Sequence, residues 1–153
     1  MRAIVLAGIA VTLPPLAIAQ VTPQELLGAW SCSAQFDDGK IWTWDASYLA
    51  DGKLRAIRFN WPEFEPGGPF LETQTTFEGN WKVEGGKLIE QLGRQVEMSI
   101  VVMENGIRKR QVIPGGEDTR ERPFEYSVTF KGNTFSATAP DGLVNSCKRR
   151  TDQ

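Results

Sequence analysis

The sequence predicts an all-β protein, a single antiparallel up-and-down β-barrel of about eight strands with one short helical turn near its start. Three observations predict this fold. Glycine-bearing turn signals recur along the chain, and the segments of about six to ten residues between them alternate apolar with polar side chains. No segment beyond the first turn sustains a helical period. The turn signals lie at 38–40, 51–53, 84–87, 104–106, 131–133 and 141–142.

The first 19 residues have the features of a secretory signal peptide. Arg2 is followed by an apolar run and a small-x-small ending at residues 17–19, which predicts cleavage before Gln20. Two prolines interrupt the run and leave it shorter than the roughly 20 residues that a spanning helix needs. We therefore expect residues 20–153 to form one domain without a membrane span, in the periplasm or secreted.

Composition narrows the function classes. Loss of Arg2 with the signal leaves 16 basic and 19 acidic residues, and this weakly acidic balance argues against a nucleic-acid partner. The nearest approach to a basic patch, residues 108–110, is interpreted as a solvated strand. The chain has no histidine, so the usual general base and the commonest zinc ligand are both missing. Neither a metal nor a cofactor is predicted.

The chain has two cysteines, Cys32 and Cys147. In an exported protein two cysteines are most simply one disulfide. Because it would close a loop of more than one hundred residues, it would stabilise the fold by up to about 4 to 5 kcal/mol in the chain-entropy model. We expect this bond to join the first strand to the last.

The short helical turn is predicted just before the first cysteine. Thr22 and Glu25 have the spacing of a capping box, and Pro23 occupies a position where no amide hydrogen is needed. Two leucines at 26–27 give the turn an apolar face, and Gly28 ends it. We expect the turn to lie across one open end of the barrel.

The strands follow from period-two alternation. The clearest is 124–131, which places apolar residues on one face and polar residues on the other. The segment 54–61 changes parity midway, which predicts a β-bulge near Ala56 and Ile57. Similar alternation appears in three further segments, 30–36, 42–48 and 96–102.

Seven aromatic residues are expected to point inward and are the candidate ligand-binding residues. An eight-stranded barrel has room either for packed side chains or for one small ligand. So many large rings favour a packed or nearly packed interior. These residues are Trp30, Trp42, Trp44, Tyr48, Phe124, Tyr126 and Phe130.

The segment 60–70 contains three prolines and two glycines, which exclude a regular strand and predict a long loop. One interpretation is a flap whose rings fold back on the barrel end. The other is a lid or a protein-contact loop, because binding residues concentrate on loops held by rigid scaffolds. The candidate partner-contact residues are Trp61, Glu63, Phe64 and Glu65.

The opening of the chain resembles the lipocalins and the broader calycin group, and more loosely small exported bacterial lipocalin-like proteins. The resemblance lies in the capped turn, in Gly28-x-Trp30 at the start of the first strand, and in the basic tail 148–150. It implies that Trp30 plugs the closed end of the barrel, with a late cationic side chain packed across it. The longer carboxy-terminal helix of the family is missing here.

Register identifies that cation. If Cys32 and Cys147 face each other on antiparallel strands, two steps outward along each strand place Trp30 opposite Arg149. A cation-π contact of this kind contributes about 0.5 to 2 kcal/mol.

Two functions are compatible with this barrel. The resemblance and the ring-rich interior imply a binder of a small apolar molecule. The alternative is a protein-interaction barrel, an envelope factor or hydrolase inhibitor, that acts through the 60–70 loop. We expect no enzyme, because no catalytic constellation is present. The nearest acid pair, Glu63 and Glu65, shares a loop, but spacing alone does not make the two side chains face each other.

Overall fold

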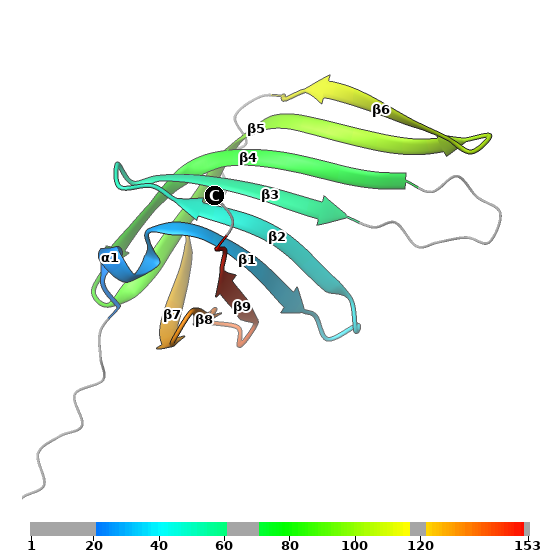
Figure 1. Cartoon of the computed structure of the whole chain (residues 1–153). Coiled ribbons are helices and arrows are strands. Elements are labelled where there is room, and N and C mark those ends of the chain that lie inside the picture. The colour runs from blue at the N-terminus through cyan, green and yellow to red at the C-terminus, as the bar shows by residue number, and fades with distance from the viewer. Residues whose placement is uncertain (1–20, 61–70, 117–121, 152–153) are drawn as a thin grey trace, which may run out of the picture.

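The structure, a computed structural model, describes residues 21–60, 71–116 and 122–151. The predicted signal peptide and the loop residues Trp61, Glu63, Phe64 and Glu65 lie outside the described residues. Within the described ranges the chain forms one helical turn, α1 (Pro23–Leu26), and nine strands (Figure 1). The strands are β1 (Gly28–Gln35), β2 (Ile41–Tyr48), β3 (Lys53–Asn60), β4 (Leu71–Glu84), β5 (Lys87–Glu104), β6 (Ile107–Pro114), β7 (Phe124–Lys131), β8 (Thr134–Thr138) and β9 (Val144–Arg149).

Eight of these strands form a closed antiparallel ring. The order β4-β3-β2-β1-β9-β8-β7-β5 is closed by the pairing of β4 with β5. The contact between β5 and β7 is short and joins Lys87–Glu90 to residues 124–127. β6 extends the far half of β5 as a hairpin, and among the described residues it pairs with no other strand (Figure 1). The predicted barrel of about eight strands is therefore confirmed.

The predicted bulge in the third strand is wrong. β3 pairs with β2 and β4 residue for residue, and the irregularities lie instead on β5, opposite Thr76 to Gly79 of β4. Leu54, Ala56 and Arg58 share the inner face of β3. The prediction failed because it assumed that Ile57 and Phe59 must face inward, whereas an unbroken strand turns them outward and Arg58 inward.

The first and last strands meet in the predicted register. Cys32 lies opposite Cys147 and forms the disulfide, and Trp30 lies opposite Arg149. The two cysteine Cα atoms are 4.1 Å apart, a separation typical of a non-hydrogen-bonded antiparallel pair. The amide of Arg150 donates to the carbonyl of Ala29 at 2.9 Å, so the pairing continues past the end of β9. We call this β1–β9 junction the seam.

The helical turn is held against one end of the ring by the seam. The guanidinium of Arg149 lies 4.1 Å from the Trp30 ring centroid and donates to the carbonyl oxygens of Leu27 and Glu25, both at 2.6 Å. The indole N–H of Trp30 donates to the carbonyl oxygen of Leu26 at 2.7 Å. These bonds satisfy carbonyl groups that the end of a short helix leaves open. Leu26 is fully buried beneath them.

The start of the turn also has the predicted pairing. The Glu25 carboxylate accepts from both the amide and the hydroxyl of Thr22, each at 2.8 Å. These bonds lower the pKa of Glu25, with the hydroxyl as the larger cause. The turn is therefore tied at both of its ends.

Gly28 is required by this arrangement in two ways. Its φ angle is +114°, a backbone conformation that residues with a Cβ atom rarely adopt. A Cβ at this position would also lie 2.9 Å from a guanidinium nitrogen of Arg149. The glycine of Gly28-x-Trp30 thus makes the space through which the arginine reaches the helical turn.

Aromatic rings fill the end of the ring next to α1. Trp30 and Phe135 pack edge to face with centroids 4.6 Å apart, and Phe130 lies against both. Tyr48 and Trp81 make a second edge-to-face pair at 5.3 Å. This half of the interior is packed, as the number of rings predicts. We call it the closed end.

We predict that Arg149→Leu lowers the free energy of unfolding by about 2 to 4 kcal/mol, because the substitution removes two charge-assisted hydrogen bonds and the cation-π contact. Lys148→Leu is the matched control, since its side chain is exposed one position away, and should change stability by less than about 0.5 kcal/mol. Urea unfolding measures both. Equal effects of the two substitutions would contradict the role given to Arg149.

Candidate functional site

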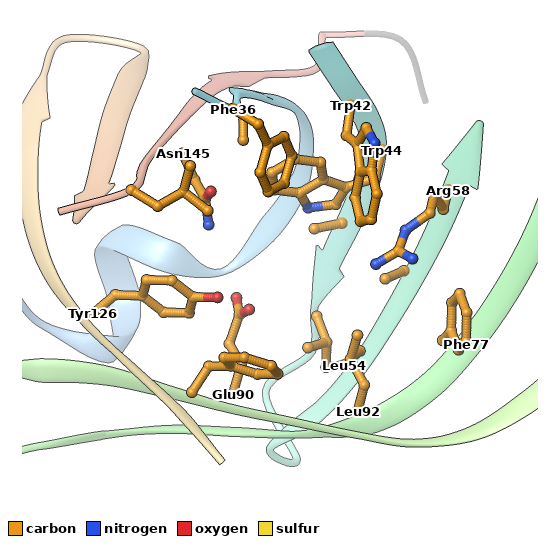
Figure 2. A pocket seen from close by; sticks show the side chains of 15 residues that line it. Phe36, Trp42, Trp44, Leu54, Arg58, Phe77, Glu90, Leu92, Tyr126 and Asn145 are labelled. Atoms are coloured by element: carbon orange, nitrogen blue, oxygen red, sulfur yellow. The ribbon is translucent and has the colours of Figure 1, made fainter. Parts of the chain in front are cut away.

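A cavity of about 260 Å³ occupies the half of the ring away from the closed end. Its walls come from β1 to β5, β7, β9 and the β8–β9 connection, because each strand turns alternate side chains inward. Figure 2 shows the side chains converging on this space. The lining residues are Ala34, Phe36, Trp42, Trp44, Ala46, Leu54, Ala56, Arg58, Phe77, Glu90, Leu92, Phe124, Tyr126, Leu143 and Asn145.

The structure divides the seven predicted ligand-binding aromatics into two groups. Trp42, Trp44, Phe124 and Tyr126 line the cavity. Trp30, Tyr48 and Phe130 do not line it, because the Trp30 and Tyr48 rings are buried in the closed end and Phe130 packs against that cluster. The expectation of a nearly packed interior therefore describes one half of the barrel, and the other half is hollow.

The cavity has a deep side and a rim. Leu54 and Ala46 are 2% exposed and form part of its floor. Trp42 and Phe124 are 40% and 45% exposed, so they line the cavity where it meets solvent. Phe36 packs on Trp42 with centroids 4.8 Å apart and extends the aromatic rim. A ligand that enters between these rings would move from water into contact with a mostly apolar surface.

One polar group of the cavity is the carboxyl of Glu90. The hydroxyl of Tyr48 donates to this carboxyl from the closed end. The hydroxyl of Tyr126 points toward it from β7, and Asn145 lies beside Tyr126 (Figure 2). Tyr126 and Asn145 share a side-chain hydrogen bond, which favours ionisation of the phenol but is outweighed by burial. Glu90 thus sits where the packed and hollow halves meet.

Burial controls the charge of this cluster. Loss of hydration raises the pKa of Glu90, and the hydrogen bond from Tyr48 opposes that rise only in part. Burial, reinforced by the Glu90 charge, also raises the pKa of Tyr126 to about 12 and that of Tyr48 well above its ordinary value. Burial therefore shifts all three groups toward their protonated forms relative to the same groups in water.

A second polar group, Arg58, lies on the opposite wall. Its guanidinium carbon is 4.6 Å from the Trp42 ring centroid and 5.6 Å from that of Phe77. Figure 2 shows the guanidinium nitrogens directed into the cavity, across from Glu90 and Tyr126. Positive charge is therefore held inside a wall of aromatic rings.

Sequence reasoning missed both polar groups. The parity of Leu54 and Ala56, continued for one more step, places Arg58 on the inner face, but the expected bulge interrupted that count. Glu90 could be found only from the pairing that sets it beside Trp81 and Phe124, since its neighbours in sequence show no clean alternation.

The polar side chains of this site can hydrogen-bond a ligand. A carboxyl, a phenol and a carboxamide on one side and a guanidinium on the other supply hydrogen-bond donors and acceptors within an apolar enclosure. Over the described residues, no cluster of three or more cysteine, aspartate or glutamate side chains is placed to hold a metal ion. The same residues include no helix with the length and apolar character needed to cross a membrane.

We predict that Glu90→Gln makes the protein more stable than wild type at pH 8 but not at pH 4. A folded pKa above the ordinary value of 4.5 means that Glu90 contributes fully below that pH and that its contribution is lost as the pH rises through the folded pKa. Glutamine cannot ionise and can still accept from Tyr48. Each unit of raised pKa corresponds to about 1.4 kcal/mol.

Urea unfolding of both proteins at several pH values measures this difference. Glu125→Gln, which removes an exposed carboxylate paired with Lys87 at 3.2 Å, is the control and should not gain stability with rising pH. A stability difference between Glu90→Gln and wild type that stays constant from pH 4 to pH 8 would show that Glu90 ionises normally.

Comparison of the chain with protein-family models, with curated protein sequences and with solved structures finds no match. The functional argument therefore depends on the geometry of the cavity.

Proposed function

We propose that this protein is an exported, lipocalin-like barrel that binds one small apolar molecule in the cavity beside Glu90 and Arg58. The observation that carries the proposal is the hollow half of the ring: a cavity of about 260 Å³ lined mainly by aromatic and aliphatic side chains, next to a closed end filled by a buried hydrophobic cluster. The proposal is for a binding protein and assigns no chemical step.

The mostly apolar lining of the cavity favours binding of an apolar ligand over filling by water. Apolar surface removed from water contributes about 25 cal/mol per Å², and the walls carry six aromatic side chains. The volume lies just below the roughly 300 Å³ at which ligand pockets usually begin, so the expected ligand is small. Disulfide closure of the seam holds these walls in place before a ligand arrives, which reduces the ordering cost of binding.

Export is part of the same proposal. Removal of the first 19 residues by a signal peptidase would deliver the chain to the periplasm or the exterior, where disulfides persist. The Cys32–Cys147 bond is compatible with that compartment. The alternative function, a protein-interaction barrel, depends on the 60–70 loop, of which residues 61–70 lie outside the described residues, and stays a prediction.

The test is to fill the cavity. Ala56 is buried in its wall, so Ala56→Phe should place a ring in the space that the ligand would occupy. We expect wild-type protein to bind the neutral fluorescent probe N-phenyl-1-naphthylamine and the variant to bind it at least about tenfold more weakly. Probe fluorescence titration measures the two affinities.

Ala50→Phe is the matched control, because Ala50 is exposed in the turn before β3 and the substitution adds the same ring outside the barrel. It should bind the probe as wild type does. Failure of the wild-type protein to bind the probe, or equal binding by Ala56→Phe, would contradict a ligand site in this cavity.

A further inference from the structure

A second concavity, a groove of about 420 Å³, is formed by β3, β4 and β5 and the turn that precedes β3 (Figure 1). Of the described residues, four charged ones line it: Lys53 and Arg55 of β3, Glu78 of β4 and Arg94 of β5. We call it the outer groove. Three cations and one carboxylate give it a local charge of +2, although the chain as a whole is acidic.

The two arginines of the outer groove lie on the face of the sheet that points away from the cavity. Leu54 and Ala56 line the cavity, so Arg55 between them points outward. Glu78 pairs with Arg55 on one side and with Arg94 on the other, and cross-strand partners share a face. All three charged side chains are exposed. The arginines therefore lie two strands apart, about 10 Å, which two long side chains can span together.

Two β-bulges in β5 put Arg94 on this outer face. Glu90 and Leu92 line the cavity, so unbroken alternation would turn Arg94 inward as well. The pairing of β4 with β5 skips Gly93 and Val96, and the two residues between them therefore exchange faces. Bulges of this kind often re-aim a side chain beside a functional site. Here they present one arginine to solvent and restore the alternation directly afterwards.

Backbone contacts fix both ends of the outer groove. Gly79 is required beside the first bulge, because a Cβ at this position would lie 2.1 Å from the carbonyl oxygen of Gln91. At the other end, the amide and the indole N–H of Trp81 donate to the carbonyl oxygens of Gly52 and Leu49, at 2.8 and 3.0 Å. These bonds hold the turn before β3, where the exposed Leu49 side chain borders the groove. The walls are therefore set before a ligand arrives.

The positive charge of the outer groove is not cancelled by its neighbours. Among the residues that the structure describes, Glu78 forms no ion pair with Arg55 or Arg94, although the pairing sets it between them. Lys53 donates to the side-chain oxygen of Asn80 at 3.2 Å, and this neutral amide leaves the lysine charge in place. An anion in the groove would meet guanidinium donors on two sides.

We propose that the outer groove binds the phosphate of a phosphomonoester, with Arg55 and Arg94 donating to its oxygens and Lys53 adding charge. A phosphomonoester carries a charge of about −1.5 to −2 at pH 7 and three terminal acceptor oxygens, so it can accept from two planar guanidiniums at once. Leu49 gives the organic part of the ligand an apolar contact. The site is separate from the cavity and does not depend on the proposed function.

Isothermal titration with phenyl phosphate at pH 8 and low salt tests the site, since salt screens exposed charges. Wild-type protein should bind this ligand, and Arg55→Gln and Arg94→Gln should each bind it at least about tenfold more weakly. Benzenesulfonate has the same ring and a single charge. It should bind to wild type at least about tenfold more weakly than phenyl phosphate does.

Arg122→Gln is the matched control, because it removes the same charge from an exposed position outside the outer groove. It should bind phenyl phosphate within about twofold of wild type. Urea unfolding checks that the variants keep wild-type stability, as expected for exposed positions. If Arg94→Gln fails to fold, Arg94→Lys provides the second measurement: it keeps the charge without the planar fork and should still weaken binding.

Vesicles distinguish the two sources of such a phosphate. Co-sedimentation of wild-type protein with vesicles of phosphatidylcholine and phosphatidic acid in equal parts, lost in Arg94→Gln, would assign the site to a lipid phosphomonoester. Binding of phenyl phosphate without co-sedimentation would assign it to a soluble one. Both outcomes support the proposal, because the recognised group is the same.

Three results would overturn the proposal. The first is that wild type binds neither the vesicles nor phenyl phosphate at concentrations up to about 10 mM. The second is an equal loss in Arg94→Gln and Arg122→Gln, because long-range attraction would then explain the effect. The third is a loss of phenyl phosphate binding in Ala56→Phe, which would place the ligand in the cavity. Weak binding of the naphthylamine probe by wild type would instead count against the proposed function alone.

Discussion

The pairing of β1 with β9 is the constraint on which the rest of the structure depends. It joins residues more than one hundred positions apart, and the disulfide between Cys32 and Cys147 fixes its register. That register brings Arg149 over Trp30 and within reach of the carbonyl groups that end the helical turn. A shift by one residue would turn Arg149 to the other face of the sheet and leave those carbonyls without a partner. Glycine at position 28 provides the space that the contact needs.

The seam also explains why the two halves of the barrel differ. Rings gathered next to Arg149 and the helical turn fill the closed end, where Trp30 and Phe135 are almost entirely buried. Away from the closed end, β3 to β5 continue beyond the short pairing of β5 with β7. Side chains from opposite strands leave a cavity between them there. Glu90 lies at this boundary, with Tyr48 on the packed side and Tyr126 on the hollow side. A carboxyl placed there is shielded from water and still adjacent to the space that a ligand would occupy.

Sequence alone predicted what short-range periodicity and covalent chemistry determine. Alternation in 124–131 gave a strand, two cysteines gave the seam, and counting from the seam gave the pairing of Trp30 with Arg149. The cavity was harder to predict from the sequence. Its position depends on which aromatic side chains meet across the barrel, whereas alternation shows only which face each strand buries. Trp42 and Trp44 were assigned to the interior but could not be separated from Trp30. Arg58 was missed because a polar residue on an inner face looked like a change of register.

The measurement that tests the seam most directly is the pattern of nuclear Overhauser effects between its two strands in the oxidised protein. Cys32 opposite Cys147 and Trp30 opposite Arg149 are positions where the Hα atoms of antiparallel strands approach closely. The account predicts strong Hα–Hα effects for both pairs. Their absence, or strong effects displaced by two residues along either strand, would contradict the register and with it the closed end, the cavity boundary and the placement of Arg149.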